Sequence, residues 1–369
     1  MKIVTVIGAR PQFIKAFPVS RAIERHNSEA SHQEIIEVLL HTGQHYDYNM
    51  SQIFFDQLNI PRPQYHLDIQ SGRHGEMTGA MLSKIESVLL QEEPDWVMVY
   101  GDTNSTLAGG LAASKLRIPV IHVEAGLRSF NRRMPEEINR VLTDHISTIL
   151  FCPTDAAVTN LNNEGIVEGV LKVGDVMYDA FLFFKDLAVT NSSILFEMGL
   201  KARSYCLATV HRQENTDDID NLQNIFAAFE QIAGSDCPLI CPVHPRTRKA
   251  LEEAGIARSN GHVRLIPPLG YLDMIALESN ARVILTDSGG VQKEAYFCRV
   301  PCVTLREETE WIETIESGWN QLGGTECRRI REAFERALYF PCSQHSGFYG
   351  GGQASRVILN HVIHYKLGL

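Results

Sequence analysis

The sequence predicts an α/β protein built from two doubly wound domains that face a cleft. Strand-like apolar runs alternate with helical segments along the whole chain, which is typical of parallel sheets. This alternation restarts near Gly174, and 369 residues is the length of two ordinary domains. We expect a first domain over residues 1–175, a second over residues 176–352, and a C-terminal helix over residues 353–369 that packs back on the first domain.

The predicted strands are short apolar runs bounded by polar or turn-forming residues. In the first half they cover residues 2–7, 34–40, 96–100, 120–123 and 149–153, and in the second half residues 205–210, 238–243, 263–266, 283–286 and 301–304. Segments with apolar residues at helical spacing lie between them, such as "PQFIKAFPVSRAIERH" and "GEMTGAMLSKIESVLLQEE". In sheets of this kind ligands bind beyond the carboxyl ends of the strands, so we expect the functional residues there.

Composition and charge narrow the possible partners and location. The net charge is −10, which argues against a nucleic-acid partner and against binding to an anionic membrane. No apolar run reaches the roughly 18 residues of a membrane span. The N-terminus enters a strand-like run at once, without the apolar region and cleavage site of a signal peptide, so we expect a cytoplasmic protein.

The eight cysteines are predicted to be buried, reduced thiols, because none forms a CxxC pair and most lie in apolar contexts. In "CPLICPVH", the residues Cys237, Cys241 and His244 have the chemistry of metal ligands. However, Cys241 ends a strand-like run, and no partner pair with zinc-finger spacing occurs. We therefore expect no metal.

One segment of the second half is typical of anion binding. "VILTDSGGVQKEAYF" is predicted as strand, turn and helix, so Ser288, Gly289 and Gly290 place backbone N–H groups at the start of the helix. A helix N-terminus attracts anions through these N–H groups and through its dipole. Glu294 on the same helix is a candidate acceptor for ribose hydroxyls. The alternative is a glycine-rich turn followed by a solvated glutamate.

Basic residues follow two other predicted strands of the second half. His211 and Arg212 follow the strand in "LATVHRQEN", and His244 and Arg246 follow the strand in "PVHPRTRK". Each histidine alone is typical of a structural residue. Two His-Arg clusters beside a glycine turn favour a diphosphate pocket.

The turn after the first strand carries a third basic cluster. "VIGARPQFIK" places Gly8, Arg10 and Lys15 there. The segment is not a GxGxxG motif, and no dinucleotide fingerprint occurs elsewhere in the chain. We therefore expect no nicotinamide cofactor.

Three carboxylates of the first half lie at or near the carboxyl ends of predicted strands. Asp102 follows one strand in "GDTNST", Glu124 follows the next in "HVEAGLRS", and Glu136 lies in "MPEE" shortly after. A single carboxylate in such a place is usually solvated, and Asp102 has the position of a helix cap. Three on adjacent turns suit general acid–base chemistry beside a sugar ring.

Taken together, these segments resemble one known family, the non-hydrolysing UDP-N-acetylglucosamine 2-epimerases. The resemblance covers nearly the whole chain and rests on segments that occur in the family order. They are "GARPQFIKAFPV", "HTGQHYD", "GDTNSTLAGGLAA", "HVEAGLRS", "MPEEINR", "HRQEN", "HP", "PLGYLDM", "DSGGVQKEA" and "REETE". The resemblance implies a glycosyltransferase-B-like fold of two Rossmann-like domains. It also implies an isomerase that uses no cofactor and no metal and forms a homodimer.

The resemblance also implies a mechanism. UDP is eliminated across C1–C2 of the sugar, a 2-acetamidoglycal remains in the cleft, and UDP adds back with the proton on the other face of C2. Asp102, Glu124 and Glu136 match the family's catalytic carboxylates, and His211 matches a catalytic histidine at the diphosphate. Tyr271 matches the segment that meets the uracil. The positions that match nucleotide-holding or charge-balancing residues are Arg10, Lys15, His244, Ser288, Gly289, Gly290, Glu294 and Arg306.

The chain departs from the commonest family pattern in three segments, "YGDTNST", "SFNRRMPEE" and "REETEWIETIESGWN". These variants are similar to a branch that acts on UDP-2,3-diacetamido-2,3-dideoxyglucuronate for surface polysaccharide. Such a uronate needs an additional cation, and Arg132 or Arg133 is a candidate, with two solvated arginines as the alternative. UDP-GlcNAc is the second candidate substrate. A hydrolysing epimerase, a retaining glycosyltransferase of the same fold and a catalytically silent nucleotide-sugar sensor are the alternative functions.

Overall fold

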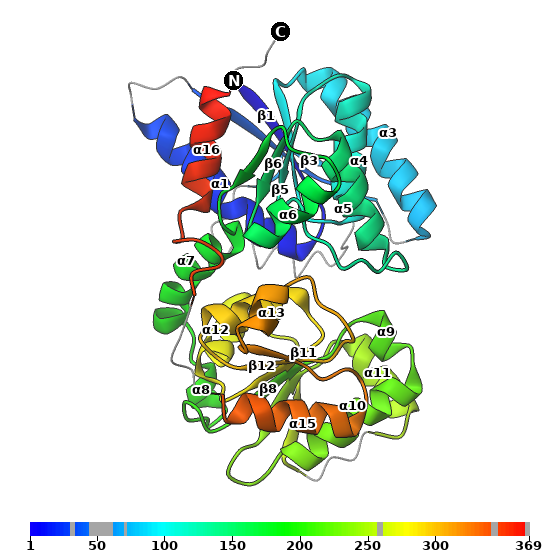
Figure 1. Ribbon diagram of the computed structural model, residues 1–369, viewed down its shortest axis with the longest axis vertical. Helices are drawn as coiled ribbons and strands as arrows, with labels where there is room; N and C mark the ends of the chain where they lie inside the picture. Colours follow the sequence, from blue (N-terminus) through cyan, green and yellow to red (C-terminus); the bar gives the residue numbers. More distant parts are fainter. Residues whose placement is uncertain (30–33, 44–61, 70–71, 257–260, 341–345, 366–369) are drawn as a thin grey trace. The chain divides into compact units, whose positions relative to one another are not determined.

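A computed structural model describes residues 1–29, 34–43, 62–69, 72–256, 261–340 and 346–365 (Figure 1). The chain forms two compact units. Unit 1 comprises Met1–Leu182 and Gly347–Leu369, and unit 2 comprises Phe183–Ser346. Each unit contains one parallel sheet with helices packed on it, which confirms the predicted fold class of two doubly wound α/β units.

The sheet of unit 1 has seven strands in the order β3-β2-β1-β4-β5-β6-β7, and neighbouring strands are parallel throughout. The strands are β1 (Lys2–Ile7), β2 (Ile36–His41), β3 (Tyr65–His66), β4 (Trp96–Tyr100), β5 (Val120–Val123), β6 (Ile149–Cys152) and β7 (Val170–Lys172). The helices are α1 (Arg10–Ser28), α3 (His74–Glu92), α4 (Asn104–Lys115), α5 (Pro135–Ile146), α6 (Asp155–Asn163), α7 (Val176–Asn191) and α16 (Ala354–His364). In Figure 1, α1 and α16 lie against each other on one face of the sheet, and α3, α4 and α5 cover the other.

The strand order reverses between β1 and β4, which are hydrogen-bonded neighbours. From β1 the chain continues to β2 on one side, and from β4 it continues to β5 on the other. At such a reversal, the carboxyl ends of the two strands are the usual ligand site, so a ligand is expected after β1 and β4. The turns after these two strands begin at Gly8 and Gly101, close to the predicted site residues.

Close packing explains why the sequence folds in this way around the reversal. The strands β1 and β4 are apolar and almost entirely buried, as parallel strands covered on both faces must be. A Cβ atom on Gly8 would lie 2.1 Å from both Ser105 Oγ and Thr42 Oγ1, so only glycine fits this turn. At the start of α4, Thr103 Oγ1 accepts a hydrogen bond from Thr106 N at 3.3 Å, so the polar "TNST" run caps the helix.

The sheet of unit 2 has six parallel strands in the order β10-β9-β8-β11-β12-β13. The strands are β8 (Cys206–Thr209), β9 (Leu239–Pro242), β10 (Val263–Ile266), β11 (Ile284–Thr286), β12 (Cys302–Thr304) and β13 (Asn320–Leu322). The helices are α8 (Ile194–Glu197), α9 (Gln213–Thr216), α10 (Ile219–Ile232), α11 (Pro245–Glu253), α12 (Tyr271–Asn280), α13 (Gly289–Phe297), α14 (Ile312–Glu316) and α15 (Cys327–Leu338). The strand order reverses between β8 and β11, so the carboxyl ends of these two strands are the expected ligand position in this sheet.

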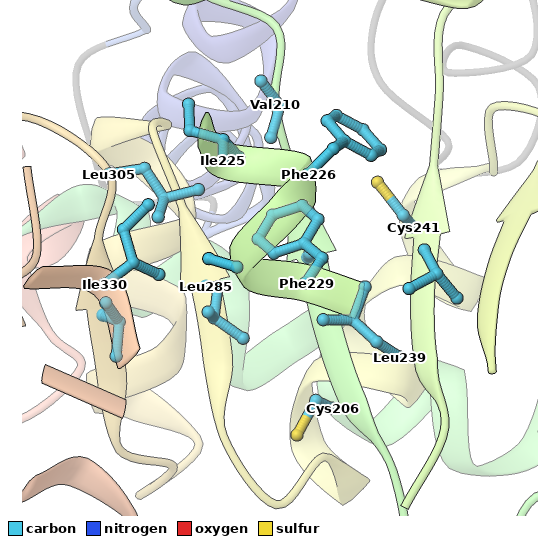
Figure 2. Close-up of a cluster of buried hydrophobic side chains, with 14 of the residues drawn as sticks. Cys206, Val210, Ile225, Phe226, Phe229, Leu239, Cys241, Leu285, Leu305 and Ile330 are labelled. Atoms are coloured by element: carbon cyan, nitrogen blue, oxygen red, sulfur yellow. The ribbon is translucent and has the colours of Figure 1, made fainter. Parts of the chain in front are cut away.

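The core of unit 2 forms where α10 and α15 pack on one face of this sheet. Figure 2 shows Ile225 and Phe229 of α10 pointing toward Leu285 and Leu239 of the strands. All four side chains are fully buried. Burying an aliphatic or aromatic side chain of this size stabilises a fold by about 1.5–3 kcal/mol, so these contacts hold β9 and β11 against α10.

The boundary between the units lies within α7. Residues 176–182, which we assigned to the second domain from the sequence, belong to unit 1 together with residues 347–369. The reason is a local one: the Asp179 carboxylate caps α16, accepting hydrogen bonds from Ala354 N at 3.0 Å and from Ser355 N at 2.8 Å. This cap ties the first half of α7 to the C-terminal helix of unit 1.

Within the described ranges, no helix has the length and apolar character needed to cross a membrane.

Candidate active site

The described residues form two half-sites, one in each unit. The carboxylate half-site of unit 1 consists of Asp102, Glu124 and Glu136, with the cations Lys15 and Arg140. The glycine-turn half-site of unit 2 is the turn from Asp287 to Gly290 with the charged residues around it. Each lies at the carboxyl ends of strands beside a reversal of strand order.

Glu124 has the most constrained backbone of the carboxylate half-site. It follows β5 with a φ angle of +70°, in the left-handed region that residues other than glycine rarely adopt. The N–H groups of Glu124 and Ala125 both donate to the carbonyl oxygen of Phe151, at 3.1 and 3.0 Å. The side chain is 7% exposed, and its Oε2 atom forms an ion pair with Lys15 Nζ. The fold thus maintains a strained turn that presents a buried carboxylate beside a cation.

Asp102 lies next to this ion pair. It follows Gly101, whose φ angle is +64°, and a Cβ atom on Gly101 would lie 3.2 Å from both Glu124 Oε2 and Lys15 Nζ. The Asp102 carboxylate forms its own ion pair with Arg140 Nη2 of α5, and its side chain is 30% exposed. The structure therefore brings two of the predicted carboxylates together on adjacent turns, each paired with a different cation.

The two adjacent glutamates of "MPEE" have different surroundings. Glu137 accepts hydrogen bonds from Ser129 N, Ser129 Oγ and Phe130 N, each at 2.9 Å, and pairs with Arg140 at 2.9 Å. It is buried and therefore holds the loop before α5. Glu136 is half-buried, and its side chain makes no hydrogen bond or ion pair with the part of the chain that the structure describes. Glu136 lies one helical turn before Arg140, on the same side of α5.

A buried charge network lies behind Asp102 and Glu124. His122 of β5 is fully buried, with Nδ1 at 2.7 Å from Asp144 Oδ1 and Nε2 at 2.7 Å from the carbonyl oxygen of Gly101. A carbonyl oxygen only accepts, so Nε2 carries a proton. Arg128 Nη1 also donates to Asp144, at 2.7 Å. Burial alone would raise the pKa of Asp144, but His122 and Arg128 outweigh it and the pKa is lowered.

His122 Nδ1 faces the Asp144 carboxylate, so the ring is held between Asp144 and the carbonyl oxygen of Gly101. His122 holds the carbonyl group of the residue before Asp102, and it is two residues before Glu124. The network fixes both turns of the carboxylate half-site from behind.

Gln12 joins the turn after β1 to the turn after β4. Its Oε1 accepts from Gly8 N at 2.8 Å and from Ala9 N at 3.0 Å. Its Nε2 donates to the carbonyl oxygen of Tyr100 at 2.9 Å. The predicted residue Arg10 begins α1 directly after this turn, and its side chain lies outside what the structure describes.

In the glycine-turn half-site, Ser288 caps α13, accepting a hydrogen bond from Val291 N at 3.4 Å. Gly289 and Gly290 form the first turn of the helix and are half-buried. The Cα atom of Gly289 faces the loop after β12, where a Cβ atom would lie 3.5 Å from Trp311 Nε1, an ordinary contact distance. As the sequence predicted, a helix N-terminus without bulky side chains follows β11, with the geometry of an anion site.

Asp287 connects this turn to the turn after β8. Its fully buried carboxylate accepts hydrogen bonds from His211 N at 3.0 Å, from Arg212 N at 3.0 Å and from Asn215 Nδ2 at 3.1 Å. The His211 ring is exposed, with Nδ1 at 3.7 Å from Asp287 Oδ1. The structure therefore places His211 and Arg212 beside the Ser288 turn.

Two buried pairs surround the helix α13. The Tyr271 hydroxyl donates to Glu294 Oε1 at 2.7 Å, which links the start of α12 to α13. Arg306 donates to both carboxylate oxygens of Glu310, each at 3.1 Å. Burial would lower the pKa of Arg306, but Glu310 outweighs it and the pKa is raised, so this side chain stays a cation.

One predicted residue lies at the edge of this half-site. His244 is exposed at the start of α11, and its carbonyl oxygen accepts from Arg248 N at 2.9 Å. It follows β9, the strand next to β8 on the side away from β11.

Four residues of the two half-sites were missed from the sequence. They are Arg140, His122, Asp287 and Glu310. The spacing of Arg140 four residues after Glu136 was a usable signal, as was the position of Asp287 at the end of a strand. Within the described ranges, no group of three or more histidine, cysteine, aspartate or glutamate side chains is arranged to hold a metal ion.

The two doubly wound units, with charged residues at the carboxyl ends of the strands beside each reversal, define a glycosyltransferase-B-like α/β protein. The sequence profile described as UDP-N-acetylglucosamine 2-epimerase matches residues 28–363. The chain belongs to the UDP-N-acetylglucosamine 2-epimerase family, whose members are isomerases. This confirms the family and the enzyme class expected from the sequence.

Three similar proteins illustrate this membership. A UDP-N-acetylglucosamine 2-epimerase homolog from Methanococcus maripaludis is 56% identical over 96% of this chain and 97% of its own length. The UDP-2,3-diacetamido-2,3-dideoxy-D-glucuronate 2-epimerase of Pseudomonas aeruginosa is 51% identical over 98% of this chain and 99% of its own. The crystal structure of Methanocaldococcus jannaschii UDP-GlcNAc 2-epimerase with UDP-GlcNAc and UDP is 45% identical, covers 99% of this chain and 100% of that chain, and superposes with a TM-score of 0.91.

Proposed function

We propose that this protein is a non-hydrolysing epimerase that inverts C2 of a UDP-2-acetamido sugar by eliminating UDP and adding it back. The observation that carries the proposal is the pairing within the carboxylate half-site. Asp102 and Glu124 lie on adjacent turns, one beside Arg140 and the other beside Lys15. Two carboxylates held beside cations in one half-site suit proton transfer at a sugar carbon.

The proposed reaction needs no oxidant or reductant. One carboxylate takes the proton from C2 as the bond from C1 to the diphosphate oxygen breaks, and the electron pair of the C2–H bond becomes the C1–C2 double bond. This leaves a 2-acetamidoglycal and UDP. UDP then adds back to C1, and an acid delivers a proton to the opposite face of C2. Asp102, Glu124 and Glu136 are the proposed groups, with the two faces shared among them.

The glycine-turn half-site is the proposed binding site for UDP. The N-terminus of α13 at Ser288, Gly289 and Gly290 suits the diphosphate, because its backbone N–H groups point at an incoming anion. Glu294 is proposed to bind the ribose, and the segment around Tyr271 to bind the uracil. The further proposed phosphate contacts of unit 2 are His211, Arg212, His244 and Arg306. In unit 1, Arg10 and Lys15 are proposed as nucleotide-holding or charge-balancing residues. His211 is also proposed to assist the departure of UDP.

The proposed substrate is UDP-2,3-diacetamido-2,3-dideoxyglucuronate, with UDP-GlcNAc as the second candidate. The 51% identity to the Pseudomonas aeruginosa enzyme supports the first, and the 45% identity to the Methanocaldococcus jannaschii enzyme supports the second. Arg132 and Arg133 lie exposed in the loop before α5, which carries the carboxylate half-site. Either cation suits the carboxylate of a uronate. We also propose a cytoplasmic homodimer that supplies surface polysaccharide synthesis.

The test of the function is the identity of the product. The purified protein is incubated separately with each UDP sugar, and the epimers are followed by NMR. We expect the gluco and manno UDP sugars to reach equilibrium without free sugar. The variants Asp102→Asn, Glu124→Gln and Glu136→Gln should bind UDP as tightly as the wild type and lose at least about 100-fold in turnover, the usual size of an acid–base contribution. Full turnover in all three would refute the assignment of the carboxylates.

The substrate is tested by comparing the two sugars in two variants. Arg132→Ala and Arg133→Ala should raise the KM for the uronate at least about tenfold in one variant, since a charge-assisted contact contributes about 1.5–3 kcal/mol. The KM for UDP-GlcNAc should not change in either variant. An equal effect on both sugars, or no effect on either, would contradict a uronate contact at this loop.

A further inference from the structure

A pair of thiols in unit 2 lies away from both half-sites. The Sγ atoms of Cys206 and Cys237 are 3.6 Å apart. Cys206 begins β8 and is fully buried, whereas Cys237 is half-buried in the turn before β9. In the parallel pairing of β8 with β9, Cys206 lies opposite Leu239. Side chains alternate along a strand, so Cys237, two residues before Leu239, points to the same face as Cys206.

The backbone holds the two cysteines in this position. Cys206 N donates to the carbonyl oxygen of Pro238 at 2.9 Å. Gly234 and Cys237 exchange two hydrogen bonds, at 3.1 and 3.2 Å, which close the turn that carries Cys237. The sulfur atoms need to approach by about 1.5 Å to reach the bond length of a disulfide, roughly 2.05 Å. The exposed residues between Gly234 and Cys237 give the turn room to make this small movement.

The two thiols also differ in their surroundings. The hydrogen bond with Cys206 and the guanidinium of Arg282 lower the pKa of Cys237 below that of an ordinary thiol. The same hydrogen bond, followed by burial, raises the pKa of Cys206. Among the described cysteines, Cys237 therefore combines partial exposure with thiolate character, the two properties of a reactive cysteine. The buried thiol beside it is placed as a resolving group.

We propose that Cys206 and Cys237 are a reversible thiol–disulfide site for small disulfide oxidants of the glutathione class. The Cys237 thiolate attacks one sulfur of glutathione disulfide, which forms a mixed disulfide and releases one glutathione thiolate. That thiolate takes the proton of Cys206, and Cys206 Sγ attacks Cys237 Sγ and displaces the second glutathione thiolate. Two protein thiols are oxidised by two electrons, and one glutathione disulfide is reduced to two glutathione molecules.

The site is separate from the proposed epimerase chemistry. The thiol pair lies at the amino end of β8, whereas His211 follows the carboxyl end of the same strand. Closing the disulfide should therefore change turnover by less than about twofold. It should raise the Tm, because a cross-link restricts the unfolded chain between residues 206 and 237. The inference does not rest on the proposed function.

The test uses the full-length protein in its native state with glutathione disulfide as the probe. After exposure, free thiols are blocked by alkylation and the protein is digested for mass spectrometry. We expect a peptide cross-linked between Cys206 and Cys237, two fewer alkylated thiols than the eight of the reduced protein, and full recovery after dithiothreitol. A glutathione adduct on Cys237 that persists without a cross-link would overturn the proposal, and so would a thiol count that stays at eight.

Three variants separate this site from general thiol oxidation. Cys237→Ser should lose the cross-link and form no glutathione adduct on Cys206. Cys206→Ser should retain a stable glutathione adduct on Cys237. Cys327→Ser is the matched control, because Cys327 is the other half-buried cysteine that the structure describes, and this variant should form the cross-link as the wild type does. A cross-link that survives in Cys237→Ser, or that disappears in Cys327→Ser, would contradict the assignment.

Discussion

Replacing Asp144 with asparagine should destabilise unit 1 far more than an ordinary conservative substitution. Asp144 is 1% exposed, and each of its oxygens faces a donor. Oδ1 accepts from His122 Nδ1 at 2.7 Å, and Oδ2 accepts from Arg128 Nη1 at 2.7 Å and from Gly126 N at 3.2 Å. Asparagine has the same shape but turns an N–H group toward one of these donors, so two donors face each other in either orientation.

The magnitude follows from the burial of the network. Removing one partner of a buried ion pair lowers the free energy of unfolding by about 3–5 kcal/mol, because the remaining charge is left without its partner. For a domain of this size each kcal/mol lowers the Tm by about 2–4 °C. The Asp144→Asn variant should therefore unfold in unit 1 at a temperature about 6–20 °C below the wild type.

The assay uses Trp96, the tryptophan of unit 1, among three in the sequence. In a background where Trp311 and Trp319 are replaced with phenylalanine, Trp96 fluorescence reports the unfolding of unit 1 alone. Glu164→Gln is the matched control, because Glu164 also pairs with Arg128 but is 28% exposed. Because water reaches this ion pair, Glu164→Gln should lower the free energy of unfolding by about 1 kcal/mol or less.

The pH dependence gives a second readout of the same network. The folded pKa of Asp144 is lowered, so the stability that it contributes is fully present above the unfolded value of about 4 and is lost as the pH falls through the folded value. The difference in free energy of unfolding between the wild type and Asp144→Asn should therefore be constant at neutral pH and should become smaller below about pH 4. The buried ion network would be refuted if Asp144→Asn lowered the free energy of unfolding by less than about 1 kcal/mol. It would also be refuted if the difference in free energy of unfolding between the two proteins stayed constant down to pH 3.

Two further substitutions test single contacts. Gly101→Ala places a methyl group 3.2 Å from Glu124 Oε2 and Lys15 Nζ at a φ angle of +64°, so it should lower the free energy of unfolding by about 1–3 kcal/mol and lower turnover at least tenfold. Wild-type kinetics in this variant would show that the turn adapts freely. Asp287→Asn weakens the acceptor that holds His211 N, so calorimetry should show UDP binding weaker by about tenfold or more, with the Trp96 unfolding of unit 1 unchanged. Unchanged UDP affinity would exclude this turn from the nucleotide site.

Most strands were predictable from the sequence, but three short strands at the edges of the sheets were not. The boundaries expected for β1, β4, β5 and β10 agree with the structure residue for residue. These strands are apolar runs bounded by turn-forming residues, which is a strong local signal. The edge strands β3, β7 and β13 were missed, because they have only two, three and three residues, and pairing with one neighbour leaves no apolar pattern to detect.

The sequence predicted which residues at the strand ends belong to the candidate site, but it did not predict their contacts with other side chains. Asp102 and Glu124 were found because each directly follows a strand. Arg140 was missed because its contact with Asp102 joins residues 38 positions apart, which only the folded chain brings together. The different surroundings of Glu136 and Glu137 could not be predicted from the sequence either. Adjacent helical residues point in different directions. Which of the two glutamates is buried depends on the loop at Ser129, which binds Glu137 in the folded chain.

The central claim is that the protein breaks the C2–H bond of a UDP-2-acetamido sugar while UDP leaves and returns. The most direct measurement is deuterium exchange: the protein is incubated in deuterated water with each UDP sugar and followed by NMR. The account predicts that deuterium enters C2 of both epimers while UDP remains attached at the end of the reaction. Epimers that interconvert with the original proton at C2 would contradict the elimination. Free sugar with UDP would show a hydrolysing enzyme, and the absence of exchange with either sugar would contradict the assignment of this chain as an epimerase of these substrates.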